Sequence, residues 1–478
     1  MYDLILKRAR LVDPKNKINK ITDIAVKSGK IAKVNEEINT NSVSKVFNLP
    51  GKVVVPGIID PHVHLSCWIG GSEGYKMMAK VGVITAVDFA GPIDDIINTI
   101  NKEGSGLNIA GLDALRPGIN ISKENPSSKE IEQFIDNSLD KGAIGIKIMG
   151  GHYPLTPEAT AKTIKIANKK MAYIAFHVGT TKTGSNLSGF KEAISLLEEH
   201  SIHFAHINSY CRGLIKEPLE ELKEIFSLIQ NRNGIVSESY LSRNNGSSGK
   251  CTNEIPDMDI TKDCLRMGGY SLTKTGLHQA IIDGFAEVIV SVNGENVLLK
   301  GIKGAQCWLD AGTDTIISFK VNISEILFLC AVHKDFNNRF LIDAFCTDGG
   351  GIPRNMIVEK GLQLIKFGAI TWEDFVIKSS LMPSRMFGWL NKGHLAVGAD
   401  ADITVLDPGR NMAVMGINKG KVIMIEGMVI GEKGRILTTG HGGKKIEEAN
   451  IDYEVFNLNN CLLYNSNKNK HINRNVVF

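Results

Sequence analysis

The stretch Val53–Leu65, VVVPGIIDPHVHL, decides the fold of this chain. Two apolar runs flank a Pro-Gly bend, and the second run ends with His62 and His64. Alternate residues of a strand point to the same face, so both imidazoles are directed to the same side. A pair of histidines packed at a turn gives the same pattern, but two imidazoles at a strand end are also half of a metal site. We therefore expect further ligands at the ends of other strands.

Seven more apolar segments repeat this pattern, with helical sequence between them. They end at or near Asp88, Ala114, Lys147, His177, His206, Glu238 and Asp348. The steps from Lys147 to His177 and from His177 to His206 are 30 and 29 residues, the length of one strand–helix unit. Strand–helix alternation is typical of a parallel sheet. Eight units predict an α/β protein with a closed (β/α)8, or TIM, barrel.

Strand-rich segments at both ends of the chain bracket the barrel. Short strands are expected in residues 1–54 and again in residues 395–445, and together they predict a small composite β-sandwich domain. The barrel is then expected to span residues 55–394, and residues 446–478 to form a C-terminal tail.

One unit of the barrel is too long for a single helix, and it lies between Glu238 and Asp348. It contains a Gly/Ser-rich loop, and the dipeptide Asn293-Gly294 predicts the turn of a β-hairpin. Residues 242–320 are therefore predicted to be an insertion that caps the mouth of the barrel.

Composition limits the partners. Net charge is only +4, from 55 Lys+Arg against 51 Asp+Glu, which excludes a strongly basic nucleic-acid surface. No apolar run reaches the roughly 18 residues that span a bilayer, so no membrane contact is expected. The eight cysteines are scattered without a CxxC pair, which predicts free thiols and a cytoplasmic location. A small-molecule substrate is the expected partner.

The polar residues at the predicted strand ends form one constellation. They are His62, His64, Lys147, His177, His206 and Asp348. A lone histidine or lysine at a strand end is usually structural, and Asp348 before three glycines fits a turn. The C-terminal ends of barrel strands open on one face, however, where active sites are assembled. Six such residues in order predict one metal centre.

These residues resemble the pattern of the metal-dependent amidohydrolase superfamily, in its two-metal branch of dihydroorotases, hydantoinases and D-aminoacylase-like deacylases. The resemblance extends from VVVPGIIDPHVHL to NKGHLAVGADADITVLDP at residues 391–408. It implies two divalent metal ions bridged by a carbamylated Lys147, with zinc expected and manganese or iron as alternatives. It also implies a homo-dimer or homo-tetramer, because such barrels often associate through their outer helices.

The same resemblance implies a role for each residue at the metal centre. His62 and His64 would hold the buried metal ion, and His177 and His206 the outer one. Asp348 would contact the buried ion and act as general acid and base toward a metal-bridging hydroxide. Lys147 lies in an apolar strand, where burial favours the neutral amine that takes up carbon dioxide.

The substrate is less constrained than the metal centre. Dihydroorotases carry an arginine where this chain has Ser66, and a histidine follows their strand-eight aspartate where this chain has Gly349. Candidate substrate contacts lie just past the strand ends, and they are Arg116, His152, Tyr153, Asn208, Tyr210, Arg212 and Gly350.

The leading hypothesis is hydrolysis of the amide C–N bond of a cyclic amide, such as a hydantoin, dihydropyrimidine or oxopurine ring. The first alternative is a D-aminoacylase-like deacylase of N-acyl amino acids, which the glycine run and the insertion favour. An anion-pairing arginine at the site would favour the deacylase, and a stacking Trp or Tyr would favour the ring. A non-catalytic or formyl-handling subunit of a larger complex is the alternative from another class.

Overall fold

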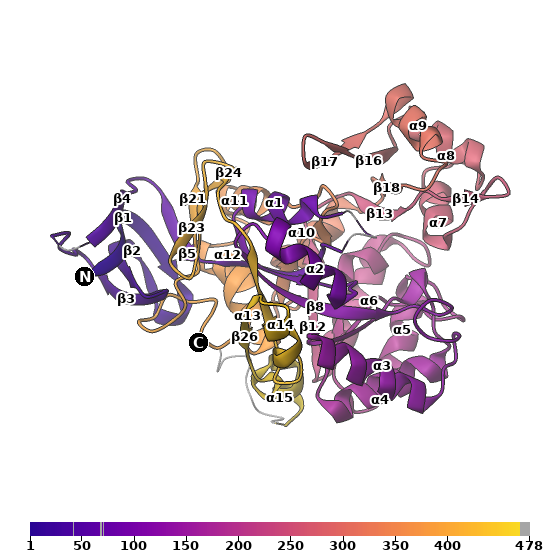
Figure 1. The fold of residues 1–478 in the computed structure, drawn as a ribbon. Coiled ribbons are helices and arrows are strands. Elements are labelled where there is room, and N and C mark those ends of the chain that lie inside the picture. Colours follow the sequence, from indigo (N-terminus) through magenta and orange to yellow (C-terminus); the bar gives the residue numbers. More distant parts are fainter. Residues whose placement is uncertain (42, 67–68, 70, 469–478) are drawn as a thin grey trace.

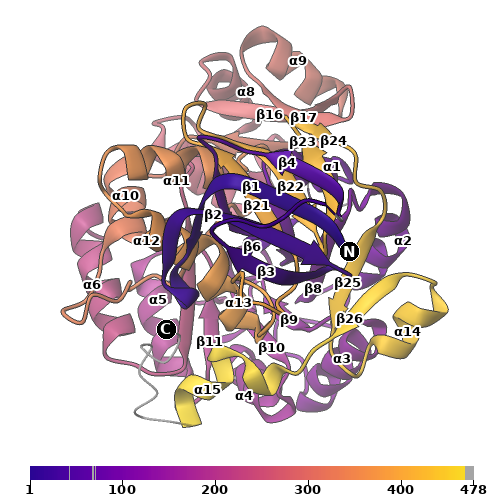
Figure 2. The same ribbon diagram turned by 90° about the vertical axis from the view of Figure 1, so that its left-hand side faces the viewer.

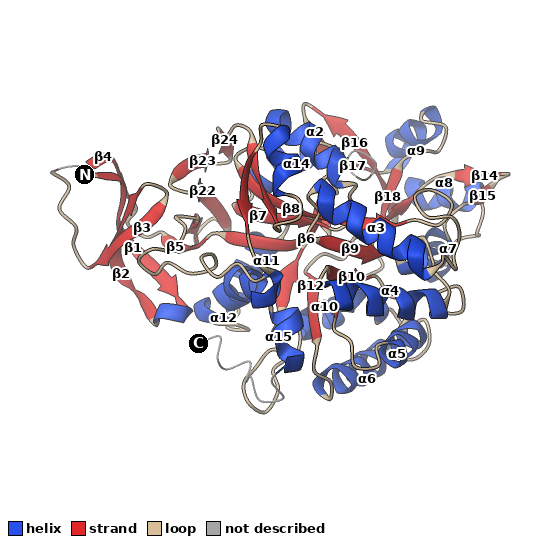
Figure 3. Ribbon diagram, turned by 60° about the horizontal axis from the view of Figure 1, so that its bottom comes forward, coloured by secondary structure: helices blue, strands red, loops and turns tan. Residues whose placement is uncertain are grey.

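The computed structural model describes residues 1–41, 43–66, 69 and 71–468 of the chain. Its centre is a parallel barrel of eight strands (Figures 1 and 3). In order around the barrel, these are β6 (Ile58–His64), β7 (Val83–Asp88), β8 (Leu107–Leu115), β9 (Gly145–Ile148), β10 (Tyr173–Phe176), β11 (Ile202–Phe204), β12 (Ile235–Tyr240) and β19 (Ala344–Cys346). The predicted (β/α)8 barrel is confirmed.

The barrel closes through a short strand that follows β19 directly. This strand, β20 (Gly349–Gly350), pairs in parallel with the end of β6. Strands β6, β7 and β8 are buried at every residue. Parallel strands covered on both faces have this property, and it explains why the sequence showed continuous apolar runs here rather than alternation.

Helices surround the barrel on the outside. They are α1 (Glu73–Lys80), α2 (Ile93–Glu103), α3 (Ser128–Lys141), α4 (Pro157–Lys170), α5 (Leu187–Leu196), α6 (Pro218–Gln230), α10 (Ser324–Val332) and α11 (Ile357–Lys366). Side-chain oxygens of Ser127, Thr156 and Asn186 accept backbone N–H groups at the starts of α3, α4 and α5. Such caps satisfy donors that a helix start leaves unpaired. After α11 the chain forms α12 (Trp372–Val376), a π-helical turn (Ile377–Leu381) and α13 (Met382–Phe387).

The small β domain is a nine-stranded sheet built from both ends of the chain (Figure 2). Its N-terminal strands are β1 (Tyr2–Asp13), β2 (Ile18–Lys27), β3 (Lys30–Asn35), β4 (Val43–Asn48) and β5 (Val53–Pro56). Its C-terminal strands are β21 (Ile403–Asp407), β22 (Met412–Asn418), β23 (Lys421–Ile425) and β24 (Met428–Val429). Antiparallel pairing of β5 with β21 joins the two groups, so the expected composite of the two ends is present.

The segment after β24 returns to the barrel. Strand β25 (Gly434–Thr438) pairs in parallel with β8 and with β26 (Asp452–Val455). Helices α14 (Gly443–Glu448) and α15 (Leu462–Lys468) also belong to this segment. Leu463 and Tyr464 of α15 pack into the hydrophobic core of the barrel. The change of sheet therefore falls before Gly434, earlier than the expected boundary at residue 445, because pairing with β8 extends the barrel sheet outward.

The long unit between β12 and β19 forms a small α/β subdomain above the barrel mouth (Figure 1). Its four-stranded sheet has the order β13 (Asn245–Ser248), β18 (Ile316–Phe319), β16 (Ala286–Val292) and β17 (Glu295–Leu299). Its other elements are β14 (Cys251–Thr252), β15 (Ile255–Pro256), α7 (Asp259–Met267), α8 (Lys274–Ile282) and α9 (Gly301–Asp310). The expected hairpin turns at Asn293 and Gly294, whose φ angles of 54° and 74° suit an Asn-Gly turn.

The junction between the β domain and the barrel contains a buried charge cluster. Lys392 Nζ lies 2.8 Å from a carboxylate oxygen of both Asp400 and Asp402. Asp402 also accepts a hydrogen bond of 3.2 Å from Asn108 on β8. Lys392 is 2% exposed, so its ammonium is fully committed to these carboxylates. No helix among the described residues is long and apolar enough to cross a membrane.

The Lys392 cluster generates a stability prediction. Lys392→Met removes the cation that pairs with the buried carboxylate of Asp402 and leaves Asp400 with Lys30, and breaking a buried pair costs about 3–5 kcal/mol. We expect the free energy of unfolding, measured by urea denaturation, to fall by that amount. The control is Lys20→Met, which removes an exposed pair with Glu36 and should barely move the midpoint. Equal midpoints for the two variants would contradict the assignment.

Candidate functional site

The six residues of the predicted constellation meet at the C-terminal mouth of the barrel. A cavity of about 620 Å³ opens there between the barrel and the insertion. Five of the six line it, and they are His64, Lys147, His177, His206 and Asp348. His62 is fully buried beside them. Residues separated by up to 286 positions in the sequence, from 62 to 348, thus reach one point because each ends a barrel strand or follows one.

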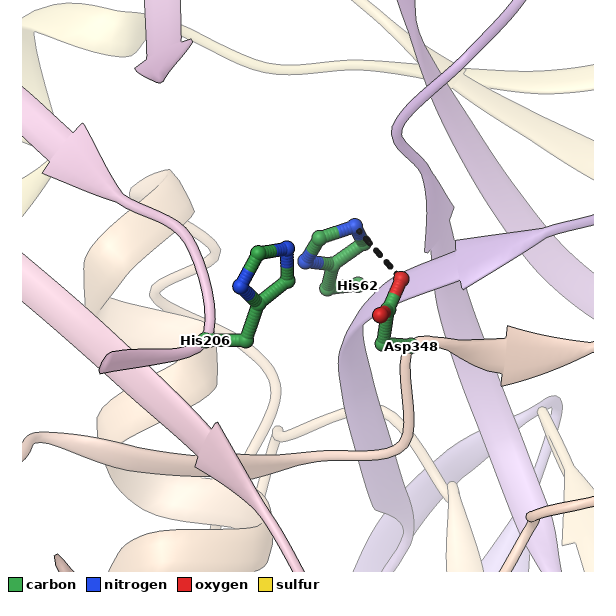
Figure 4. Close-up of side chains that lie close together, drawn as sticks. All are labelled: His62, His206 and Asp348. Carbon is green, nitrogen blue, oxygen red and sulfur yellow. Dashed lines mark ion pairs between the residues drawn. The ribbon is translucent and has the colours of Figure 1, made fainter. Parts of the chain in front are cut away.

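His62, His206 and Asp348 form one close group at the site (Figure 4). Their potential ligand atoms all lie within 4.8 Å of one another. His62 Nε2 lies 3.2 Å from Asp348 Oδ1. The backbone brings the aspartate to this place, since Asp348 donates its N–H to the carbonyl of His62 at 2.9 Å as the barrel closes.

His64 and Lys147 adjoin this group. His64 Nε2 lies 2.8 Å from Asp348 Oδ1, and Lys147 Nζ lies 3.0 Å from His62 Nε2. The observed face of β6 agrees with the expectation that His62 and His64 point the same way. Lys147 is 2% exposed, although a lysine side chain usually carries a charged ammonium group that lies in water.

Each of three imidazoles has one ring nitrogen held by a neighbour. His62 Nδ1 lies 2.6 Å from Glu238 Oε1, His177 Nε2 lies 2.9 Å from Ser185 Oγ, and His206 Nδ1 lies 2.8 Å from Ser209 Oγ. A ring fixed at one nitrogen presents the other in a defined direction. The side chains are therefore oriented by the protein itself.

Arg354 supplies the counter-charge of Asp348. Its Nη2 lies 2.6 Å from Asp348 Oδ2, and its Nε donates to the Asp348 carbonyl at 2.6 Å. A third contact runs from Nη1 to the carbonyl of Asn244 at 3.0 Å, at the start of the insertion. The guanidinium also lies over the ring of Tyr240, 5.1 Å from its centre. Arg354 is 3% exposed and lines the cavity.

Burial governs the protonation of the site. It lowers the pKa of His62, His177 and His206 well below the usual value, so these imidazoles are neutral. It also lowers the pKa of Lys147 to about 8. Burial is the largest single influence on Asp348 and would raise its pKa. The Arg354 guanidinium, together with His62, His206 and the hydrogen bond from His64, outweighs burial and holds that pKa well below its usual range.

The side chains present fit divalent metal ions. Neutral imidazoles and an ionised carboxylate are the forms that bind zinc and related ions. Among the described residues, the buried Nδ1 of His64 has no hydrogen-bond partner, which leaves a donor atom for a ligand. The pKa of Lys147, lowered to about 8, raises the fraction of the neutral amine that carbamylation needs. The donor set thus suits a metal centre.

The predicted substrate contacts separate into two groups. His152 and Tyr153 line the cavity, and the His152 ring packs edge-on against His177 at 4.9 Å between centres. The other five lie outside the described cavity lining, and they are Arg116, Asn208, Tyr210, Arg212 and Gly350. Tyr210 and Asn208 instead contact backbone N–H groups of Val178 and Tyr240.

Two of these residues have clear positions in the framework. Gly350 has a φ of 74°, and a Cβ there would lie 2.4 Å from the carbonyl oxygen of His64, so glycine is required for closure. Arg212 donates to Asn245 at 2.8 Å and to Asn322 at 3.0 Å, at the two roots of the insertion.

Two residues at the site were not singled out from the sequence. Glu238 was recognised as a strand end but given no role, although a carboxylate within an apolar strand is itself a signal of a buried partner. Arg354 lies six positions after Asp348, beyond the glycine run, where no strand end marks it. The insertion also contributes lining residues, among them Lys250, Asp257, Met258 and Asp314.

Comparisons with known proteins agree with this geometry. Residues 328–436 match the Amidohydrolase family. A dihydroorotase of Aquifex aeolicus is 23% identical over 485 aligned positions, which cover 93% of this chain and 99% of the relative.

Two solved structures resemble the whole chain. One is N-acyl-D-glutamate deacylase from Bordetella bronchiseptica, complexed with zinc and a phosphonate inhibitor, with a TM-score of 0.66 and 13% identity over 91% of this chain and 99% of that one. The other is dihydropyrimidinase from Brevibacillus agri, with a TM-score of 0.60 and 15% identity over 91% and 98%.

The barrel, the six residues at its mouth and the family match agree with one another. Residues 328–436 carry sequence of the Amidohydrolase family, on a barrel whose mouth brings the six residues together. The chain is thus similar over almost its whole length to a dihydroorotase, and similar in fold to an N-acyl-D-glutamate deacylase and a dihydropyrimidinase.

Proposed function

We propose that this protein hydrolyses the amide C–N bond of a cyclic amide, with Asp348 as general acid and base. One observation carries the proposal: four imidazoles, Lys147 and Asp348 converge on one cavity at the barrel mouth. A cavity of about 620 Å³ accommodates a hydantoin- or dihydropyrimidine-sized ring with a substituent.

The same six residues would hold two divalent ions, with zinc as the expected metal. Lys147, once carbamylated, would bridge the pair, with His62 and His64 on the buried side and His177 and His206 on the outer side. Bound metal would polarise the scissile carbonyl and lower the pKa of water.

The chain's own groups handle the proton. Asp348 Oδ1 faces His62 and His64, while its Oδ2 is held by Arg354 at 2.6 Å. The ion pair keeps Asp348 ionised, which is the form that accepts a proton from the attacking water. Protonated at Oδ1, it then donates that proton to the leaving ring nitrogen.

The cavity walls support a planar substrate. Tyr153, His152 and the insertion residue Met258 are among the residues that line the cavity. An aromatic ring and an apolar thioether suit the face of an amide ring. The insertion also covers the mouth and limits the access of bulk water during the reaction.

Deacylation of N-acyl amino acids is the second candidate. It is favoured by Arg354, the arginine at the site, and by Lys250 of the insertion, which lines the same cavity. Arg354 already makes three contacts with Asp348 and Asn244. A guanidinium has five N–H donors, so it retains capacity for a substrate carboxylate. A formyl-handling subunit of a larger complex stays the more distant alternative.

A cytoplasmic location is part of the proposal. The cysteines of the described chain are free thiols, among them Cys211, Cys330 and Cys346 in the interior. Free buried thiols accord with a reducing compartment.

The substrate class is tested by a direct screen of the zinc-loaded protein. We expect turnover of 5-substituted hydantoins or dihydropyrimidines and little turnover of N-acetyl D- or L-amino acids. Ring opening is measured by the change in ultraviolet absorbance. The reverse preference would replace the ring by the deacylase. Turnover of neither class, in a protein with its full metal complement, would contradict both.

Metal content tests the bridged centre. We expect about two equivalents of metal per chain in the wild type purified with bicarbonate, and a sharp fall in Lys147→Ala. The pKa of about 8 for the Lys147 amine also gives the direction of a pH effect, because the neutral amine predominates only above that pH. At fixed dissolved carbon dioxide, the rate of metal reconstitution of the metal-free protein should therefore increase as pH rises through about 8. One equivalent or less, unchanged by the mutation, would mean that Lys147 is structural.

The role of Asp348 is tested by Asp348→Asn. An amide cannot take up the proton, so we expect kcat to fall about 10²- to 10⁴-fold in a folded protein. The matched control is Asp343→Asn, a buried aspartate at the start of the same strand segment, which accepts a hydrogen bond from Ser237 far from the cavity. A kcat for Asp348→Asn equal to that of the control would remove the acid–base assignment.

A further inference from the structure

The buried carboxylate of Glu238 contacts two residues of the site, His62 and His206. Its Oε1 lies 2.6 Å from Nδ1 of His62, and its Oε2 accepts the backbone N–H of His206 at 2.5 Å. Glu238 is 0% exposed, and it faces the barrel interior from β12. The two carboxylate oxygens of Glu238 thus contact residues at the ends of two different barrel strands.

The backbone at His206 explains why it needs such a partner. Its φ of 29° and ψ of 68° lie outside the regions that residues other than glycine prefer. A strained conformation of this kind persists only where the surroundings hold it. The bond from the His206 N–H to Glu238 Oε2 is one such restraint, and it fixes the direction in which the imidazole leaves the strand end.

The contact at His62 is compatible with two positions of the proton. If Nδ1 carries the proton and donates to a carboxylate, the lone pair of Nε2 is free. If Glu238 carries the proton and donates to Nδ1, then Nε2 is protonated and cannot bind a metal ion. His62 Nε2 faces Lys147 Nζ at 3.0 Å and Asp348 Oδ1 at 3.2 Å. The position of the proton therefore determines whether Nε2 can bind a metal ion beside these two groups.

We propose that Glu238 is a positioning residue that fixes His62 as the Nδ1–H tautomer and holds the backbone of His206 in place. The proposal rests on the proposed metal-dependent function, and it adds a residue that acts through two ligands without touching the substrate. A metal-ligating histidine commonly donates its second N–H to a carboxylate. Here a single carboxylate would align two ligands at once.

A metal site made of Glu238 itself is a weaker explanation. His62, Glu238 and Cys346 also bring their ligand atoms within 4.8 Å of one another. The 2.6 Å separation of His62 Nδ1 from Glu238 Oε1 is, however, a hydrogen-bond distance. A proton occupies that gap, and an ion between the two atoms would have to push them apart.

The test is Glu238→Gln, which keeps the shape but changes the donors and acceptors. Glutamine has one acceptor oxygen, and the fixed N–H of His206 requires it. Its NH2 group then faces His62 Nδ1 and drives the proton to Nε2. The matched control is Glu221→Gln, another fully buried glutamate, which accepts only the backbone N–H groups of Gly213, Ile215 and Lys216.

Two measurements are made on the wild type and both variants. Zinc affinity is measured by competition with a chromophoric chelator, and the His62 tautomer is read from long-range ¹⁵N–¹H spectra of the metal-free protein, assigned with His62→Gln. We expect the Nδ1–H tautomer in the wild type, the Nε2–H tautomer in Glu238→Gln, and zinc affinity about 10- to 100-fold lower in that variant. Glu221→Gln should keep the wild-type tautomer and affinity.

The outcomes separate this proposal from the function on which it rests. An Nε2–H tautomer in the wild type, or zinc affinity within twofold of wild type in Glu238→Gln, overturns the role of Glu238. A wild type that binds no zinc overturns the proposed function, while its tautomer still decides whether Glu238 sets the proton on His62. If Glu238→Gln does not fold, the wild-type tautomer alone decides.

Discussion

The pairing of β20 with the end of β6 is the constraint on which the site depends. Through it, Asp348 and Gly351 donate their N–H groups to the carbonyls of His62 and His64 at 2.9 and 2.8 Å. The last barrel strand is thereby tied to the first, and the aspartate side chain is brought against both imidazoles. Only glycine allows the close approach at Gly350. The contacts that close the barrel therefore also bring the residues of the site together.

Charge balance within the closed barrel follows from burial. Removal from water keeps the imidazoles of His62, His177 and His206 neutral by lowering their pKa, and it lowers the pKa of Lys147 to about 8. The same burial would protonate Asp348, so the carboxylate needs its own cation, which Arg354 provides at 2.6 Å. One environment thus raises the fraction of neutral amine at Lys147 and keeps the nearby carboxylate of Asp348 charged.

The sequence predicts the barrel and the convergent residues because both depend on local patterns. Each of the six residues ends a continuous apolar strand or follows one closely, and the barrel topology alone brings strand ends together. Contacts that depend on loop geometry were not accessible in this way. Arg212 follows a strand end, as a substrate contact would, but the turn after His206 directs it to Asn245 and Asn322. Arg354 reaches the site from a loop whose path depends on Gly349 and Gly350, which no periodicity describes.

The position of Arg212 connects the insertion to the chemistry. Its guanidinium holds Asn245 and Asn322, at the entry and exit of the insertion, and Asn322 donates to the carbonyl of Asn244 at 3.1 Å. That same carbonyl accepts Nη1 of Arg354 at 3.0 Å. The insertion that lines the cavity is therefore joined through Asn244 and Arg354 to Asp348. A shift of the insertion would therefore act on the counter-ion of Asp348, so the cavity wall and the carboxylate at the barrel mouth are linked through hydrogen bonds.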